Sequence, residues 1–353
     1  MIRRRALLGA GALLPGAAWA QAQDRRRTPQ SLTESGWYAK GRTKTRAVRF
    51  AGTGGVSLAG TLLMPLFSEI QYVPGIVLVA GSGPTDRDGN NPLAPDRIDL
   101  LREIAELLAR NGIASLRYDK RGIGQSTPRP RGSLEEQEAF FAWDNFVGDV
   151  EAAHAELLRH DEIKPYATAL LGHSEGGLLA LAASRALATR KLHALVLAAT
   201  PGRKLEDILR AQIARDAPPS LRLPTDRAIA AILETGRVPN NLPPELQLLF
   251  PLYAGPFLKS LMSFDPAAAL AESRLPCLLV QGGADRQVVP MEDVQPLIDA
   301  LRTRNISGEA VVIPQVSHNL KTVTGPADPG FGGPLSPAVA GTLLKWLVPA
   351  LGA

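Results

Sequence analysis

The chain has 353 residues, of which 45% are hydrophobic and 21% are charged, a composition typical of a globular protein with material for a large buried core. The 39 basic residues outnumber the 34 acidic ones, but three of the arginines lie in the first 20 residues, which contain no acidic residue. The rest of the chain carries 36 basic and 34 acidic residues, and this near balance gives no support for nucleic-acid binding.

The first 20 residues, MIRRRALLGAGALLPGAAWA, have the parts of a cleaved secretory signal: a cluster of arginines, a short apolar stretch and the ending Ala18-Trp19-Ala20. Because the apolar stretch is too short to span a bilayer comfortably, we expect cleavage after Ala20 and no stable membrane insertion of the mature chain. A short membrane anchor is the alternative. The Arg4-Arg5 pair also resembles a twin-arginine signal, so a periplasmic or secreted protein is expected.

Residues 21–43 are polar and predict a flexible lead-in before a folded core that begins at residue 44. Two β-like runs, 45–52 and 56–65, are separated by a glycine-rich turn and predict a hairpin. The continuous apolar run 75–81 is typical of a strand that is buried on both faces.

Helices and strands alternate from there to Thr200. The helical spacing of apolar residues predicts helices at 98–112, 145–160 and 175–188, and strands are predicted at 114–119, 167–172 and 194–200. Alternation of this kind predicts an α/β fold, with a mostly parallel sheet covered by helices on both faces.

Residues 202–265 break this alternation, because they combine helical stretches with many prolines and lack β-branched runs. We therefore expect a helical insertion that divides the core into residues 44–201 and 266–353. The second part contains predicted strands and helices in alternation, at 275–285, 291–304, 309–318 and 337–351. The lone cysteine, Cys277, lies in an apolar run and predicts a buried structural thiol, which excludes zinc bound by a cysteine cluster.

The stretch Gly172-His173-Ser174-Glu175-Gly176 fits the pattern G-x-S-x-G, with a predicted strand before it and a predicted helix after it. Such a turn strains the serine backbone and brings neighbouring chain close, so the flanking positions need glycine. Its serine hydroxyl points away from the sheet, and the following helix N-terminus favours negative charge. Ser174 is the predicted nucleophile, the alternative being a polar residue in a tight turn.

A serine nucleophile needs a base and a carboxylate that orients this base. Of five histidines, only His318 follows the last predicted strand, at the carboxyl edge of the sheet where ligands bind. Asp285 ends the strand before it and is the predicted acid. Its rival, Asp119, is expected to tie its own loop to nearby backbone and to Arg121, whereas Glu292 and Asp293 are expected on a solvated helix face.

The negative charge that develops during acyl transfer requires backbone N–H donors. We predict the amide of Glu175, directly after the nucleophile, and the amide of Ser82, in the glycine-rich loop 80–90. The charged residues 86–88 of this loop either pair with one another or shape the pocket.

These motifs resemble the α/β-hydrolase superfamily over residues 44–350, in GHSEGG, QGGADRQV, the VSH loop and DKRGIGQS. The last is similar to a loop of serine aminopeptidase-like and proline-iminopeptidase-like members. A GSGP-x-DRDG loop combined with GHSEGG resembles bacterial carboxylesterases with a helical cap. This resemblance implies hydrolysis of small carboxylic esters through an acyl-enzyme, without metal or cofactor. One departure is Ala80-Gly81, where His-Gly is common in the superfamily.

The sequence is compatible with three functions. A carboxylesterase for short-chain esters is favoured, with six apolar residues of the insertion as candidates for the pocket roof: Leu249, Phe250, Leu252, Tyr253, Phe257 and Leu261. An aminopeptidase or amidase would need acidic residues that hold a substrate amine, for which Glu206, Asp207 and Glu245 are candidates. A non-catalytic periplasmic binding protein would be expected to have a broken triad, whereas Ser, Asp and His are all present in the order that α/β-hydrolases use.

Overall fold

The computed structural model describes residues 38–40, 43–66, 72–188, 191–325 and 327–353. The predicted signal and most of the predicted lead-in lie outside this part of the chain. Within the lead-in, β1 (Tyr38–Lys40) pairs antiparallel with β2 (Thr43–Ala51), although the sequence predicted no element there. No described helix is both long enough and apolar enough to cross a membrane.

The remaining strands are β3 (Ser57–Pro65), β4 (Val73–Val79), β5 (Ala114–Tyr118), β6 (Ile163–His173), β7 (Ala194–Ala198), β8 (Cys277–Gly282) and β9 (Gly308–Ile313). The described strands form one nine-stranded sheet in the order β1-β2-β3-β5-β4-β6-β7-β8-β9. β2 and β3 form the predicted hairpin, with Phe50 opposite Leu58, and β3 pairs antiparallel with β5. All pairs from β5 to β9 are parallel, which confirms the mostly parallel sheet.

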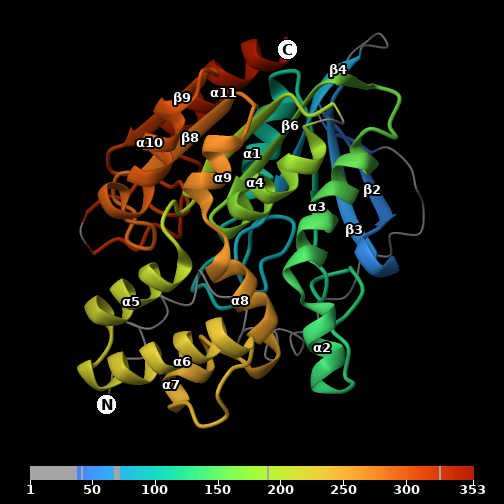
Figure 1. Cartoon of the computed structure of the whole chain (residues 1–353). Helices are drawn as coiled ribbons and strands as arrows, with labels where there is room; N and C mark the ends of the chain where they lie inside the picture. Colours follow the sequence, from blue (N-terminus) through green and yellow to red (C-terminus); the bar gives the residue numbers. More distant parts are fainter. Residues whose placement is uncertain (1–37, 41–42, 67–71, 189–190, 326) are drawn as a thin grey trace.

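Helices cover both faces of this sheet (Figure 1). On one face lie α1 (Leu100–Arg110) and α11 (Pro337–Leu351), and on the other lie α3 (Trp143–Leu157), α4 (Glu175–Leu187), α9 (Pro266–Glu272) and α10 (Gln295–Thr303). The side chains of β4 point alternately to the two faces of the sheet. Ile76 packs with residues of α1 and α11, whereas Val77 packs with the helices on the other face. This is why the run 75–81 is apolar throughout.

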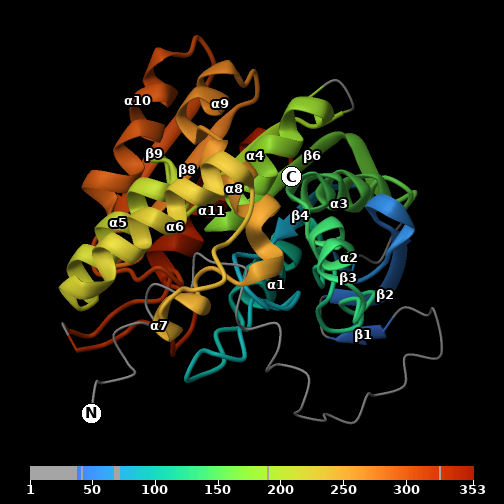
Figure 2. The same ribbon diagram turned by 60° about the horizontal axis from the view of Figure 1, so that its bottom comes forward.

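The segment 202–265 contains α5 (Leu205–Asp216), η4 (Pro219–Leu221), α6 (Arg222–Thr235), α7 (Pro244–Gln247), η5 (Leu252–Ala254) and α8 (Gly255–Ser263). In Figure 1 these helices, coloured yellow to orange, lie at the bottom, and in Figure 2 α5, α6 and α8 lie in front of the sheet. We call this segment the helical insertion. Phe257 of α8 packs edge-on against Phe146 of α3, with ring centroids 5.4 Å apart, so the insertion continues the core on that face.

Two elements depart from the sequence prediction. α2 (Leu134–Phe140) precedes α3 and lies beside α8 and η5, where no helix was expected. The start of α2 could have been predicted from the sequence, because Ser133 and Glu136 form a capping box in which each side chain accepts from the other's backbone N–H. The helix expected at 291–304 instead begins as a π-helical turn, η6 (Pro290–Val294), and continues as α10.

Candidate active site

The turn between β6 and α4 holds Ser174 in a strained backbone conformation. β6 ends at His173 and α4 begins at Glu175, so Ser174 is the only residue of the turn. Its φ of 55° and ψ of −124° lie outside the regions that an L-residue ordinarily occupies. The backbone N–H of Ser174 donates to the carbonyl oxygen of Ala198 on β7, 2.9 Å away, which ties the turn to the sheet. Strain of this kind persists where the surrounding structure imposes it.

The glycines of this motif allow two backbone segments to approach closely. A Cβ added to Gly172 would lie 2.2 Å from the carbonyl oxygen of Gly176. A Cβ added to Gly176 would lie 2.3 Å from the carbonyl oxygen of Val79 on β4. Neither position therefore has room for a side chain.

We expect Gly172→Ala to lower the free energy of unfolding by about 1–3 kcal/mol, because the new methyl group meets backbone that cannot move aside. Gly341→Ala is the matched control. Gly341 is exposed in α11 and has open space around it, so alanine should raise the free energy of unfolding by about 0.5–1 kcal/mol. Urea unfolding of both variants measures the difference, and an unchanged midpoint for Gly172→Ala would contradict the steric argument.

The Ser174 side chain is buried. The residue is only 1% exposed, and its Oγ has no hydrogen-bond partner among the described residues. A buried hydroxyl without a partner is uncommon in a folded core. Ser174 Oγ is therefore available to a group that enters the site.

The structure brings Asp285 and His318 together. His318 Nδ1 lies 2.8 Å from Asp285 Oδ2, and the side chain of Asp285 is fully buried. Three further donors hold the carboxylate. The backbone N–H groups of Gln287 and Val288 donate to Oδ1, at 2.7 and 2.9 Å. Gln281 Nε2 donates to Oδ2 at 2.9 Å, so the position of each carboxylate oxygen is fixed.

His173 links His318 to the serine turn. The two imidazole rings lie 4.9 Å apart between centroids, and His173 Nε2 donates to the backbone carbonyl of His318 at 2.9 Å. Burial lowers the pKa of His173 to about 3, so this ring is neutral near pH 7. Because His173 directly precedes Ser174, these contacts bring the His318 loop to the turn that carries the serine.

The glycine-rich loop 80–90 runs past the same turn. A Cβ added to Gly81 would lie 3.4 Å from Ser174 Cβ, which places this loop directly against the serine. Ser82 and Glu175, whose amides were predicted as oxyanion donors, are 3% and 2% exposed. Both candidates are therefore buried, as Ser174 is.

Lys120 is a buried cation beside these two residues. Its Nζ donates to the carbonyl oxygen of Gly81 and lies 3.9 Å from Glu175 Oε1. Burial raises the pKa of Glu175 to about 7 and lowers the pKa of Lys120, while the opposite charge of each partner counteracts these shifts. Glu175 Oε2 has no hydrogen-bond partner in the described part of the chain.

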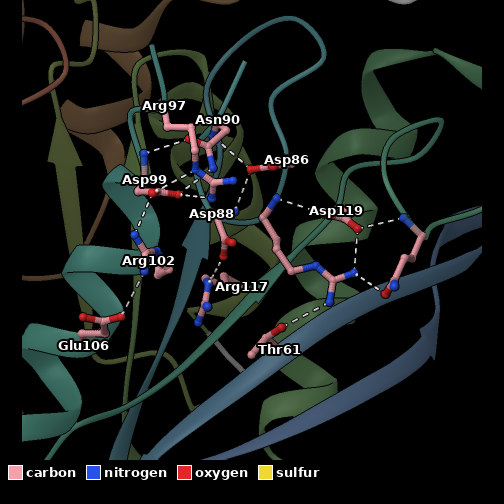
Figure 3. A network of polar contacts seen from close by, with 12 residues as sticks. Thr61, Asp86, Asp88, Asn90, Arg97, Asp99, Arg102, Glu106, Arg117 and Asp119 are labelled. Atoms are coloured by element: carbon pink, nitrogen blue, oxygen red, sulfur yellow. Dashed lines mark hydrogen bonds and ion pairs between the residues drawn. The ribbon is translucent and has the colours of Figure 1, made fainter. Parts of the chain in front are cut away.

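Two ion pairs tie loop 80–90 to β5 and the residue after it (Figure 3). Arg87 pairs with Asp119 at 2.6 Å, and Arg117 pairs with Asp88 at 2.8 Å. The alternative in which residues 86–88 pair with one another is therefore wrong for Arg87 and Asp88, because Asp88 pairs with a residue of β5 and Arg87 with the residue that follows β5. Asp86 is held by backbone N–H donors, and burial raises its pKa to about 6.

Asp119, the rival acid, ties its loop as expected, but to a different cation. It accepts from the backbone N–H groups of Arg87 and Gln125, both at 2.9 Å, and from the guanidinium of Arg87. Arg121 instead pairs with Asp149 of α3, at 2.7 Å. The carboxylate of Asp119 is thus fully engaged by the loops that it joins.

A cavity opens between the start of α4 and the helical insertion. It is lined by Glu175 and Arg203 and by six largely apolar neighbours: Leu178, Pro201, Leu205, Leu261, Phe264 and Pro266. Of the six expected roof residues, Leu261 lines this cavity. Phe257 packs against Trp143 and Phe146, and Leu252 is 46% exposed, so neither residue lines the cavity.

The candidates for holding a substrate amine lie elsewhere. Asp207 and Glu245 are exposed, and Asp207 contacts Arg210 at 3.4 Å. Glu206 is half-buried and does not line the cavity. No cluster of three or more His, Cys, Asp or Glu side chains suited to a metal ion occurs in the described residues.

Residues 96–322, well over half of the chain, match the family described as serine aminopeptidase, S33. The chain belongs to the S33 family. The matched range includes Lys120, Ser174, Asp285 and His318, whereas Ser82 lies before it. This S33 chain is also 30% identical over 216 residues to esterase EstD of Thermotoga maritima, over 61% of its own length and 47% of that protein's length. It thus spans about half of that relative.

Solved structures confirm the α/β-hydrolase fold of this S33 member. Est1E of Butyrivibrio proteoclasticus, with ferulic acid bound, has a TM-score of 0.55 at 16% identity, over 87% of this chain and 100% of that one. An acetyl xylan esterase of Paenibacillus sp. R4 has a TM-score of 0.56 at 16% identity, over 89% and 87%. A puromycin-hydrolyzing peptidase of Mycobacterium tuberculosis has a TM-score of 0.54 at 20% identity, over 88% and 40%. The S33 chain thus shares its fold with esterases and with a peptidase.

Sequence reasoning missed two residues of this S33 site. The sequence identified Lys120 only as part of the DKRGIGQS loop and His173 only as part of the GHSEGG motif. The contacts that matter join positions 39 and 145 residues apart, from Lys120 to Gly81 and from His173 to His318. The only available signal was their place next to motif residues.

Proposed function

We propose that this protein is an exported carboxylesterase that hydrolyses small, short-chain esters through an acyl-enzyme. Ser174 is the nucleophile, His318 the general base and Asp285 the acid that orients it. The observation that carries this proposal is the buried Asp285–His318 pair, linked through His173 to the strained turn at Ser174.

The proposed reaction follows from these positions. His318 Nε2 accepts the Ser174 proton as Oγ attacks the ester carbonyl, while Asp285 stabilises the imidazolium that forms. The backbone N–H groups of Ser82 and Glu175 are the proposed donors to the oxyanion. His318 then gives its proton to the leaving alcohol, and a water molecule activated by the same residue releases the acid.

The cavity supports an ester in preference to an aminoacyl amide. Its lining is largely apolar, and its one carboxyl group, Glu175, faces a buried lysine. A substrate amine would have to compete with Lys120 for this carboxyl. The family description and the peptidase among the structural neighbours favour the second candidate, an aminopeptidase of the same fold.

A substrate panel tests the proposal. We propose that the acyl group enters the small cavity beside Glu175, the residue after Ser174. On this basis we expect kcat/KM to be highest for acetyl or butyryl esters and to fall at least about tenfold for octanoyl and lauroyl esters. Leu261→Ala should shift this preference toward longer chains, since Leu261 lines the cavity. Labelling by a fluorophosphonate, lost in Ser174→Ala, would support Ser174 as the nucleophile. A greater kcat/KM for alanine p-nitroanilide than for every ester would favour the aminopeptidase instead.

Export is a separate part of the proposal and rests on the basic start, apolar stretch and Ala-Trp-Ala ending of residues 1–20. Expressed with its native start in a Gram-negative host, the protein should be recovered from the periplasm with Gln21 as its first residue. N-terminal sequencing measures this directly. An intact Met1 in the cytoplasmic fraction would contradict it.

A further inference from the structure

Lys120 occupies a position that calls for an explanation beyond stability. The residue is 3% exposed, and its ammonium group has two described neighbours, the Gly81 carbonyl and Glu175. Removing a lysine and a glutamate from water costs free energy that their attraction often only balances, so a buried ion pair is weak evidence of a gain in stability. The contact with Gly81 suggests a different role.

The Gly81 carbonyl and the Ser82 N–H belong to one peptide group. In a trans peptide these two bonds point in nearly opposite directions within one plane. A cation that binds the oxygen therefore fixes the direction of the N–H. It also draws electron density toward the oxygen and makes the N–H a stronger donor.

Glu175 connects this arrangement to the second donor. Its carboxylate lies 3.9 Å from Lys120 Nζ, and its own backbone N–H directly follows Ser174. Lys120 thus contacts the peptide group that contains one proposed donor, the Ser82 N–H. It also pairs with the side chain of Glu175, whose backbone N–H is the other proposed donor.

We propose that Lys120 is a positioning residue that orients and polarises the Gly81–Ser82 peptide for oxyanion binding, with Glu175 as its counter-ion. This inference rests on the proposed function. Lys120 touches no reacting atom. It acts through the Ser82 N–H, and its contribution is realised when negative charge develops on the substrate oxygen.

Lys120→Met removes the ammonium group and keeps a chain of similar length. We expect kcat for butyryl ester hydrolysis to fall about 10- to 100-fold, somewhat less than for the loss of an oxyanion donor itself, while KM changes less than about threefold. A trifluoromethyl ketone, which forms a tetrahedral oxyanion adduct with serine, should lose affinity by about the same factor as kcat/KM. A purely structural role would not link these two losses.

The single variant leaves Glu175 buried without a partner and could unfold. The double variant Lys120→Met/Glu175→Gln removes both charges and should fold, because no uncompensated buried charge is left. The same loss of kcat and of ketone affinity is expected in it. Arg117→Met is the comparison for a loosened loop, since it breaks the Arg117–Asp88 pair without touching Gly81. It should lower Tm and change kcat less than about threefold.

A folded double variant with wild-type kcat and wild-type ketone affinity would overturn the inference, as would a loss of kcat with unchanged ketone affinity. Neither result affects the proposed function as long as Ser174→Ala is inactive. Conversely, if wild-type protein hydrolyses no ester in the panel, or if Ser174→Ala retains its activity, the proposed function itself fails.

Discussion

Replacing Ser174 by alanine is expected to lower kcat for a butyryl ester about 10⁶-fold and to leave the protein folded. The activity is lost because no other group can form the acyl-enzyme. The fold persists because alanine removes only a hydroxyl that makes no hydrogen bond in the described structure, and both residues meet the same backbone strain at φ 55°. Steady-state kinetics and thermal unfolding measure the two effects.

Ser184→Ala is the matched control for this variant. Ser184 is also a buried serine and lies on α4, the helix that follows Ser174, but its Oγ donates within the helix, to the carbonyl of Leu181 at 2.7 Å. Its replacement should leave kcat within about twofold and lower the free energy of unfolding by about 1 kcal/mol. Near-normal ester hydrolysis by Ser174→Ala would remove Ser174 from the mechanism.

Asp285→Asn is expected to lower kcat about 10⁴-fold, because the substitution replaces the hydrogen-bond acceptor that faces His318 by a donor. The backbone N–H groups of Gln287 and Val288 both point at Oδ1, so the asparagine carbonyl must occupy that position. Its NH₂ group then faces His318 Nδ1 and Gln281 Nε2. To accept from this NH₂, the neutral imidazole must carry its proton on Nε2, where it can no longer accept one from Ser174.

Asp149→Asn separates this effect from a loss of stability. Asp149 is a buried carboxylate that pairs with Arg121, so asparagine there should lower Tm but keep kcat within about threefold. Measuring kcat and Tm for both variants distinguishes a loss of catalysis from a loss of stability. If Asp285→Asn loses no more activity than Asp149→Asn, Asp285 does not orient the base.

The fold was largely predictable because its strands and helices have distinct apolar patterns. The run 75–81 is apolar at every position because β4 is covered on both sides, and helix 98–112 shows the spacing of α1, which buries one face. The short elements β1 and α2 carry no such pattern. β1 is three residues long, and no residue of α2 is buried, so only the Ser133–Glu136 capping box marked the latter.

The candidate site was predictable where residues follow strands and not where they meet across the fold. Asp285 and His318 follow β8 and β9, which are parallel neighbours, so their proximity was an expected consequence of topology. The ion-pair partner of Asp119 could not be predicted from the topology of the sheet. Arg121 is close to Asp119 in the sequence, whereas Arg87 is distant in the sequence and close in space. The path of loop 80–90 brings Arg87 to the Asp119 carboxylate, and this path could not be predicted from the sequence.

The packing of the helical insertion has a consequence for how the molecule folds. Phe257 and Tyr253 of the insertion lie in the same apolar cluster as Trp143 and Phe146 of α3, which in turn pack on the sheet. The insertion is therefore not a separable folding unit, because its formation and the completion of that layer bury the same surface. A shortened chain without residues 202–265 would expose aromatic rings of α3 to water and aggregate, whereas the intact chain should unfold in one cooperative transition.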